Sequence, residues 1–234
     1  RTERGDHCVA QLRTMEEKRK GARVKEEERR SRELVQQRLS DSLELTISAM
    51  ATTMEMRDPY TSGHQKGVAK IAQAIAKEMG MDNDAIHGLK MAALIHDIGK
   101  VSIPSELLTK PTKLSPLEYS LIKEHVNKGY LILKDIPFPW PIADMVRQHH
   151  ERMDGSGYPQ GLKGDQIIIG ARVLAVADTI ESMSSHRPYR PALGLNRAMQ
   201  EVITESEQGK LDANVVQAAI RLYERGELGE KMDK

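Results

Sequence analysis

The chain has 234 residues, of which 39% are hydrophobic and 29% are charged, and its formal net charge is +1. This length allows one large domain or a domain with an appendage, and the near-neutral charge excludes bulk electrostatic attraction to nucleic acid polymers or anionic membranes. The apolar runs are too short to cross a bilayer, no secretory signal pattern is present, and the single cysteine, Cys8, excludes an internal disulfide. We therefore expect a soluble cytoplasmic protein, or the cytoplasmic part of a longer one, without membrane contact in this stretch.

Residues 1–38 predict a charged connector helix. Oppositely charged residues stand four apart between residues 16 and 33, a spacing that stabilises an exposed helix. Leu12 and Met15 would begin a coiled-coil seam, but charged residues from Arg19 onward interrupt it. A solvated connector is therefore favoured over a strong dimer zipper, and a homodimer through this helix stays open.

Residues 39–234 predict one all-α domain, because apolar residues recur there at helical spacing. Ser115, Pro116 and Glu118 form a capping box that starts one of the helices. Strand alternation is absent, except for a short run at Ile167–Ile169 that could equally open a helix. The predicted helices cover about 35–54, 68–79, 84–99, a stretch from 116, then 141–151, 171–183, 196–207 and 212–225, with a loop rich in glycine at 154–159.

Seven residues with metal-binding side chains fall on helix faces that should be buried. They are His64, His96, Asp97, His125, His149, His150 and Asp178. One such residue is usually a hydrogen-bonded core residue, but burying all seven without partners would cost on the order of several kcal/mol each. A cationic centre removes this penalty, since imidazoles and carboxylates are ligands of divalent metals. Seven donors exceed what one ion needs, so the set predicts two divalent ions that share a bridging carboxylate and a bridging water. The absence of cysteine from the set favours iron or manganese over structural zinc.

Two longer motifs surround these residues. His96-Asp97, followed by Ile98-Gly99-Lys100, resembles the signature of the HD hydrolase superfamily. The stretch from His149 to Pro159, HHERMDGSGYP, narrows the resemblance to the HD-GYP family of cyclic di-GMP phosphodiesterases. Segments 57–64 and 187–190 resemble flanking motifs of the same family, and the resemblance extends from about Leu39 to Arg225. It implies an HD-domain helical bundle with a C-terminal GYP extension.

The resemblance also implies a role for each matching residue. The seven residues would be the metal ligands, with Asp97 bridging the two ions, and Asp97 and Lys100 would be the catalytic residues. Lys100 would neutralise charge that develops on a phosphoryl oxygen of the scissile phosphate. Some family members carry a glutamate for a third metal where this chain has Tyr60, so we expect two ions. Glu181 stands where aspartate is common, a change expected to affect rate more than activity. The implied substrate contacts are Lys100, Tyr158, Glu181, Arg187 and Arg190.

The expected reaction is metal-dependent hydrolysis of cyclic di-GMP to pGpG, with further cleavage to GMP left open. A hydroxide bridging the two metals would attack phosphorus in line, and the 3′-oxygen would leave. One alternative is an HD hydrolase acting on another nucleotide, or an oxygen-activating diiron enzyme, which the motif at 187–190 disfavours. Another is a catalytically silent module that binds cyclic di-GMP or docks a diguanylate cyclase through the GYP loop, which the complete ligand set disfavours.

One further resemblance concerns the N-terminus. Residues 9–13 and 15–18 loosely resemble the last strand and exit of a PAS sensor domain. The connector helix would then carry a signal from a sensor to the phosphodiesterase.

Overall fold

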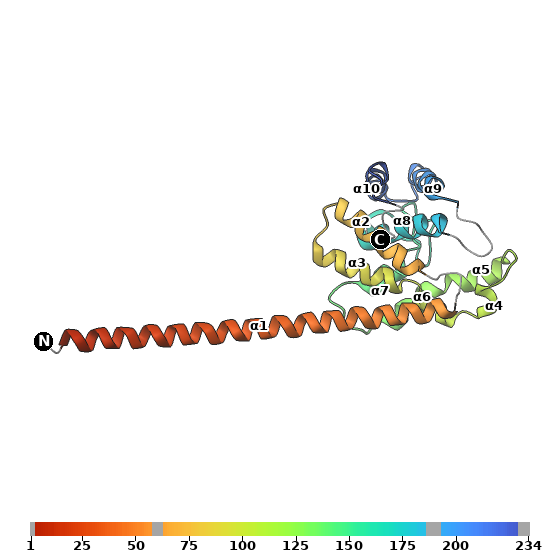
Figure 1. The fold of residues 1–234 in the computed structure, drawn as a ribbon. Helices are drawn as coiled ribbons and strands as arrows, with labels where there is room; N and C mark the ends of the chain where they lie inside the picture. Colours follow the sequence, from red (N-terminus) through yellow and green to blue (C-terminus); the bar gives the residue numbers. More distant parts are fainter. Residues whose placement is uncertain (1–2, 58–62, 186–192, 229–234) are drawn as a thin grey trace. The chain divides into compact units, whose positions relative to one another are not determined.

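The computed structural model describes residues 3–57, 63–185 and 193–228, and the prediction of an all-α fold is confirmed, since these residues contain helices and no strand (Figure 1). The chain divides into two compact units, Arg1–Thr46 and Ile47–Lys234. Its elements are α1 (Glu3–Arg57), α2 (His64–Glu78), α3 (Asn83–Ile95), η2 (Ile98–Ser102), α4 (Ser105–Leu108), α5 (Pro116–Lys123), α6 (His125–Leu133), α7 (Ile142–Gln148), η3 (Gly164–Gln166), α8 (Ile169–Ser184), α9 (Leu195–Glu207) and α10 (Ala213–Glu224).

The first unit is the N-terminal part of α1, whose described side chains from 19 to 39 are almost all exposed. Arg29 pairs with Glu26 at 2.8 Å and with Glu33 at 2.9 Å, so charges three and four residues apart interact along the helix surface. Such exposed pairs contribute little each, and they keep the helix solvated rather than packed.

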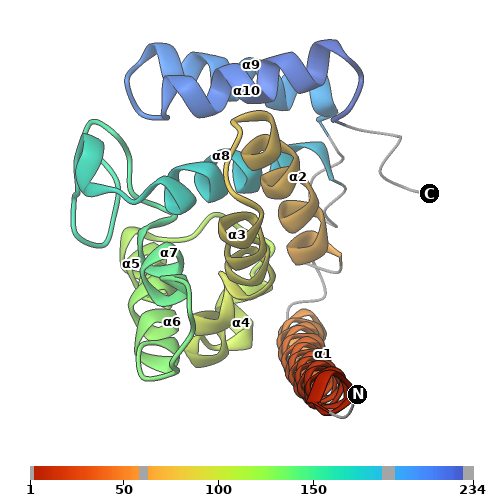
Figure 2. The same ribbon diagram turned by 90° about the vertical axis from the view of Figure 1, so that its left-hand side faces the viewer.

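The second unit has an aliphatic core built around α2, α3 and α8. Val68, Ile75, Leu89, Leu174 and Ile180 are each fully buried there. Figure 2 shows α9 and α10 side by side at one end of this unit, next to α8 and α2, with α4 to α7 at the opposite end.

Two helices end before the predicted residue. The helix predicted to reach Gly99 ends at Ile95, and η2 begins at Ile98, so His96 and Asp97 lie in the turn between them. The helix predicted to run from 141 to about 151 ends at Gln148. The helix that begins after Ser115, for which the sequence predicted no end, ends at Lys123, and α6 begins at His125. The first break falls at two predicted metal ligands, and the break between α5 and α6 falls at Glu124, directly before the predicted ligand His125.

Other local predictions are confirmed. The hydroxyl of Ser115 accepts a hydrogen bond from the Glu118 N–H at 3.3 Å, and the Glu118 carboxylate accepts from the Ser115 N–H at 2.7 Å. The apolar run at 167–169 opens a helix, since α8 begins at Ile169. Among the described residues, no helix combines the length and the apolar character that a membrane span requires.

Candidate metal centre

Three of the predicted ligands are oriented by a backbone carbonyl three residues earlier, which lies in α3 for His96, in α5 for His125 and in α7 for His149. His96, His125 and His149 each place Nδ1 beside the carbonyl oxygen three residues earlier, at 2.8, 2.7 and 2.7 Å. A carbonyl oxygen only accepts, so Nδ1 carries the proton in all three rings. Each ring therefore presents the unprotonated Nε2, which is the form that binds a metal.

Asp97 faces two of these histidines with different oxygens. Its Oδ2 lies 3.5 Å from His96 Nε2, and its Oδ1 lies 3.5 Å from His125 Nε2. The ammonium of Lys100 lies 2.7 Å from Oδ2. Burial alone would raise the pKa of Asp97, but Lys100 and the surrounding histidines hold it well below its ordinary value. Asp97 is thus a buried carboxylate that stays ionised and points toward both sides of the cluster.

A second carboxylate comes from α8. Asp178 Oδ1 lies 3.2 Å from His64 Nε2 and 3.9 Å from His96 Nε2. Burial would lower the pKa of His64, but the carboxylates of Asp178 and Glu181 outweigh it and raise this pKa to about 9. Burial would likewise raise the pKa of Asp178, but its hydrogen bond with His64 and that ring's charge hold it well below its ordinary value. A divalent cation between His64 Nε2 and Asp178 would take the place of the proton that joins them.

His125, His149 and His150 differ from His64, because their surroundings lower the pKa of the imidazole instead of raising it. Their removal from water lowers the pKa of His149 to about 3 and also lowers the pKa values of His125 and His150. The ring centroids of His149 and His150 are 4.0 Å apart, and those of His125 and His150 are 5.2 Å apart. The Nε2 atoms of His125 and His149 are buried without a hydrogen-bond partner among the described residues. Buried acceptors of this kind are costly unless a cation or a donor satisfies them.

All seven predicted ligands come together in three overlapping groups. These are His125, His149 and His150; His64, His96 and Asp178; and His96, Asp97 and His149. Within each group the candidate ligand atoms lie within 4.8 Å of one another. Two ligands each about 2.1 Å from one ion and at right angles would be roughly 3 Å apart, so the observed 3.2 and 3.5 Å separations are close to those of a loaded site. The nitrogen and oxygen donors therefore fit a divalent metal.

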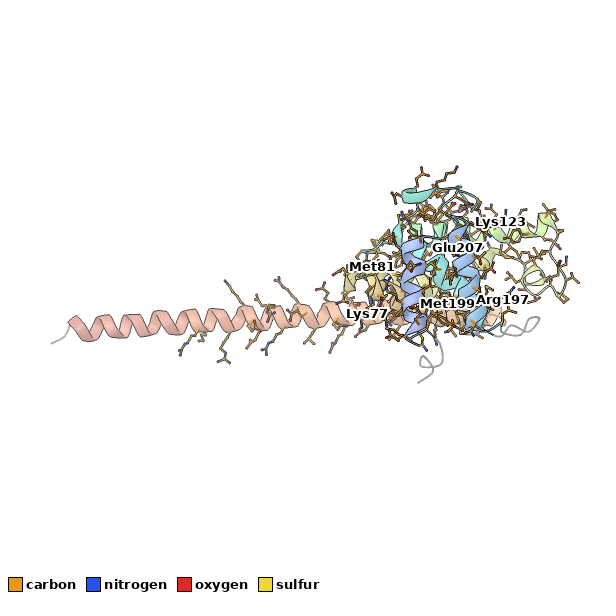
Figure 3. All side chains as sticks on the ribbon, turned by 90° about the horizontal axis from the view of Figure 1, so that it is seen from above. Lys77, Met81, Lys123, Arg197, Met199 and Glu207 are labelled. Atoms are coloured by element: carbon orange, nitrogen blue, oxygen red, sulfur yellow. The ribbon has the colours of Figure 1, made fainter. Side chains whose placement is uncertain are left out.

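The glycine-rich loop at 154–159, here called the GYP loop, borders this cluster through Tyr158. Its ring stacks on His150, with centroids 4.9 Å apart, and its N–H donates to the His150 carbonyl at 3.2 Å. The Lys123 ammonium lies 5.4 Å from the centroid of the Tyr158 ring and 5.3 Å from that of Tyr119. Lys123 is the last residue of α5 (Figure 3). Sequence reasoning missed Lys123, although its position two residues before His125 was a usable signal.

Sequence reasoning also missed Glu151, which fastens the same loop. This carboxylate is only 2% exposed and accepts hydrogen bonds from the backbone N–H groups of Gln160 at 2.6 Å and Leu162 at 3.0 Å. Because Tyr158 lies between these anchor points and His150, Glu151 holds the loop that carries the tyrosine. The signal was a carboxylate adjoining two histidines and preceding a glycine-rich loop.

The predicted substrate contacts have different outcomes. Tyr158 and Lys100 lie at the cluster, while Glu181 is buried on α8 and contacts His64 Nδ1. Their contact with substrate stays a prediction. Arg187 and Arg190, like Tyr60, lie outside the described residues.

A family model and several curated relatives match this chain. The HD domain family matches residues 35–215. A 3′3′-cGAMP-specific phosphodiesterase of Vibrio cholerae is 36% identical over 74% of this chain and 40% of the relative. A cyclic di-GMP phosphodiesterase of Thermotoga maritima is 41% identical over 72% of this chain and 46% of the relative. The cyclic di-GMP phosphodiesterase response regulator RpfG of Xanthomonas campestris is 36% identical over 75% and 47%. The chain thus spans less than half the length of these curated relatives.

Solved structures share the fold. Bd1817, an HDG"Y"P protein from Bdellovibrio bacteriovorus, aligns with a TM-score of 0.57 at 21% identity, over 69% of this chain and 51% of that chain. The HD domain of the phosphodiesterase PgpH from L. monocytogenes, in complex with cyclic-di-AMP, aligns with a TM-score of 0.54 at 17% identity, over 73% and 91%. At these identities the likeness shows the fold alone.

Proposed function

Because the chain belongs to the HD domain family and, within it, to the HD-GYP phosphodiesterases, we propose that it hydrolyses cyclic di-GMP to pGpG, and further cleavage to GMP stays open. The observation that carries this proposal is the set of three overlapping ligand groups. His96 belongs to two of these groups, and His149 also belongs to two. One mononuclear site would not use all seven donors, whereas two neighbouring ions would.

The proposed cofactors are two divalent ions, iron or manganese, held by the seven residues of the three groups. When bound, such ions activate a water molecule at neutral pH and neutralise charge on the phosphoryl oxygens. Asp97 is suited to bridge them, since each of its oxygens faces a different histidine. The nitrogen and oxygen donors favour these metals over ions that prefer thiolates.

The remaining residues of the site would bind and orient the substrate. Lys100 places a cation 2.7 Å from Asp97, where a phosphate held against the metals would also meet it. Tyr158 offers an aromatic face beside His150 for packing, and Arg187 and Arg190 are proposed to bind phosphates as the motif implies. The Lys123 ammonium, close to Tyr158, adds positive charge at the same border.

A related dinucleotide is the second candidate substrate, because three of the matching relatives are named 3′3′-cGAMP-specific phosphodiesterases. The two substrates share a guanine and both phosphodiesters, so the metal centre would treat them alike. Discrimination between them would depend on contacts to the second base.

The location of the protein in the cell and its protein partners stay predictions. They are the cytoplasmic location, the homodimer through the N-terminal helix and the diguanylate cyclase partner at the GYP loop. The division into a connector at 1–38 and a catalytic domain at 39–234 also stays a prediction.

The decisive experiment measures turnover of cyclic di-GMP, 3′3′-cGAMP and cyclic-di-AMP by protein reconstituted anaerobically with iron(II) or manganese(II). Wild type is compared with Asp97→Ala and with Glu207→Gln, which changes an exposed carboxylate on α9 (Figure 3). We expect pGpG from wild type and Glu207→Gln and none from Asp97→Ala. Two bound ions and measurable cyclic di-GMP binding without hydrolysis of any dinucleotide would refute the enzyme and support the silent binding module.

A further inference from the structure

His64 is oriented differently from His96, His125 and His149, whose Nδ1 atoms each contact the carbonyl oxygen three residues earlier in the chain. It is the first residue of α2, so no preceding turn of that helix offers a carbonyl oxygen to Nδ1. Its Nδ1 instead contacts Glu181 Oε2, which comes from α8. An imidazole held only at Nε2 could rotate or exchange tautomers, so the partner at Nδ1 decides which nitrogen faces the cluster.

Glu181 is held in turn by its surroundings. Its side chain is 8% exposed, and its second oxygen, Oε1, accepts a hydrogen bond from the Ser185 hydroxyl at 2.6 Å. Both carboxylate oxygens are therefore engaged within the protein. Asp178 and Glu181 are three residues apart on α8, so one helix face contacts both nitrogens of the His64 ring.

The neighbouring helix leaves space for this glutamate. A Cβ atom at Gly67, one turn after His64, would lie 2.8 Å from Glu181 Cγ and 3.0 Å from Oε1. Any larger residue at position 67 would displace the glutamate side chain. Gly67 and Glu181 are thus matched in size, and this pairing is independent of any substrate.

We propose that Glu181 is a positioning residue, which fixes the tautomer and the orientation of His64 so that Nε2 faces Asp178 and the metal between them. This inference rests on the proposed metal centre and assigns Glu181 a role different from the substrate contact that the family resemblance implies. Partners of metal-binding histidines typically change metal affinity by roughly 10–100-fold when they are removed.

The test is titration of metal-free protein with manganese(II), with the number of ions and their affinities as the readout. Glu181→Leu removes every acceptor, whereas Glu181→Gln keeps an oxygen that can accept from Nδ1. We expect manganese affinity at one of two sites to fall roughly 10–100-fold in Glu181→Leu and less in Glu181→Gln. Gly67→Ala should weaken the same site by displacing the glutamate, and Glu207→Gln should leave both sites unchanged.

Thermal unfolding of the metal-free variants separates positioning from loss of fold, and Glu181→Gln and Gly67→Ala carry the test if Glu181→Leu does not fold. If wild type and all three variants bind two ions equally well and only the KM for the dinucleotide rises, Glu181 is a substrate contact and the inference is wrong. Wild type that binds no manganese would refute the proposed metal centre together with the inference.

Discussion

Replacing Gly99 by alanine should damage both the stability and the metal centre. In η2, a Cβ atom at Gly99 would lie 1.8 Å from the backbone oxygen of His125 and 2.5 Å from the backbone nitrogen of Gly129. Both obstacles belong to the backbone of α6, so they cannot be relieved by rotating a side chain. Ordinary contact would require α6 to move by more than about 1 Å, and overpacking of this kind costs about 1–3 kcal/mol and occasionally more.

Gly129→Ala supplies the matched control. There the added Cβ would meet the Val146 Cγ1 methyl group at 2.9 Å, which belongs to a side chain that can shift. We expect about 1 kcal/mol for Gly129→Ala and about 3 kcal/mol or more for Gly99→Ala. Only Gly99→Ala should move His125 away from Asp97. In the present structure His125 Nε2 lies 3.5 Å from Asp97 Oδ1.

Urea unfolding of the metal-free proteins measures the stability difference, and manganese(II) titration measures the effect on the centre. If Gly99→Ala unfolds within about 0.5 kcal/mol of Gly129→Ala and binds manganese as wild type does, the close approach of η2 and α6 is not what positions His125.

Three further predictions concern metal removal, the loop and pH. Chelation should lower the melting temperature, because ions at 100 times their dissociation constant stabilise the folded state by about 2.7 kcal/mol per site, or roughly 5–10 °C for a domain of this size, as scanning calorimetry would detect. Glu151→Gln should cost about 1.5–3 kcal/mol and speed amide hydrogen exchange at Gln160 or Leu162, since an amide cannot accept from both N–H groups equally; unchanged exchange would contradict this. The pKa of Glu78 is lowered to about 2 by its hydrogen bonds, chiefly with Arg225, so this pair stabilises the fold above pH 4.5 and less as the pH falls toward 2. The difference in melting temperature between wild type and Glu78→Gln should accordingly shrink from pH 6 to pH 3, and a constant difference would argue against the pair.

The local features of this fold could be predicted because they depend on neighbouring residues. The capping box at Ser115 and Glu118 needs only four consecutive positions. Helical periodicity likewise assigned the predicted ligands to buried faces. The break at Glu124 was not predicted, because the apolar pattern continues across it and α6 packs against η2 and α7, which lie elsewhere in the sequence.

The arrangement of the site was predictable only in part. Helix faces indicated which residues turn inward, and the family resemblance indicated that these residues share a role as metal ligands. The contact of Glu181 with His64 joins residues 117 positions apart, so it depends on how α2 packs against α8. Nothing in the local pattern of either helix specifies that contact, and the resemblance pointed to substrate instead.

The hydrogen bonds from three histidines to backbone carbonyls three residues earlier have a consequence for which ion is acquired in the cell. These rings are aimed by the backbone before any metal arrives, so exchanging one ion for another of similar radius requires no rearrangement of His96, His125 or His149. Nitrogen and oxygen donors do not by themselves separate divalent metals of similar size, so metal availability helps to decide which ion is bound. Occupancy by iron or manganese would then follow the supply of each ion during synthesis, and growth medium would change the metal content of the purified protein.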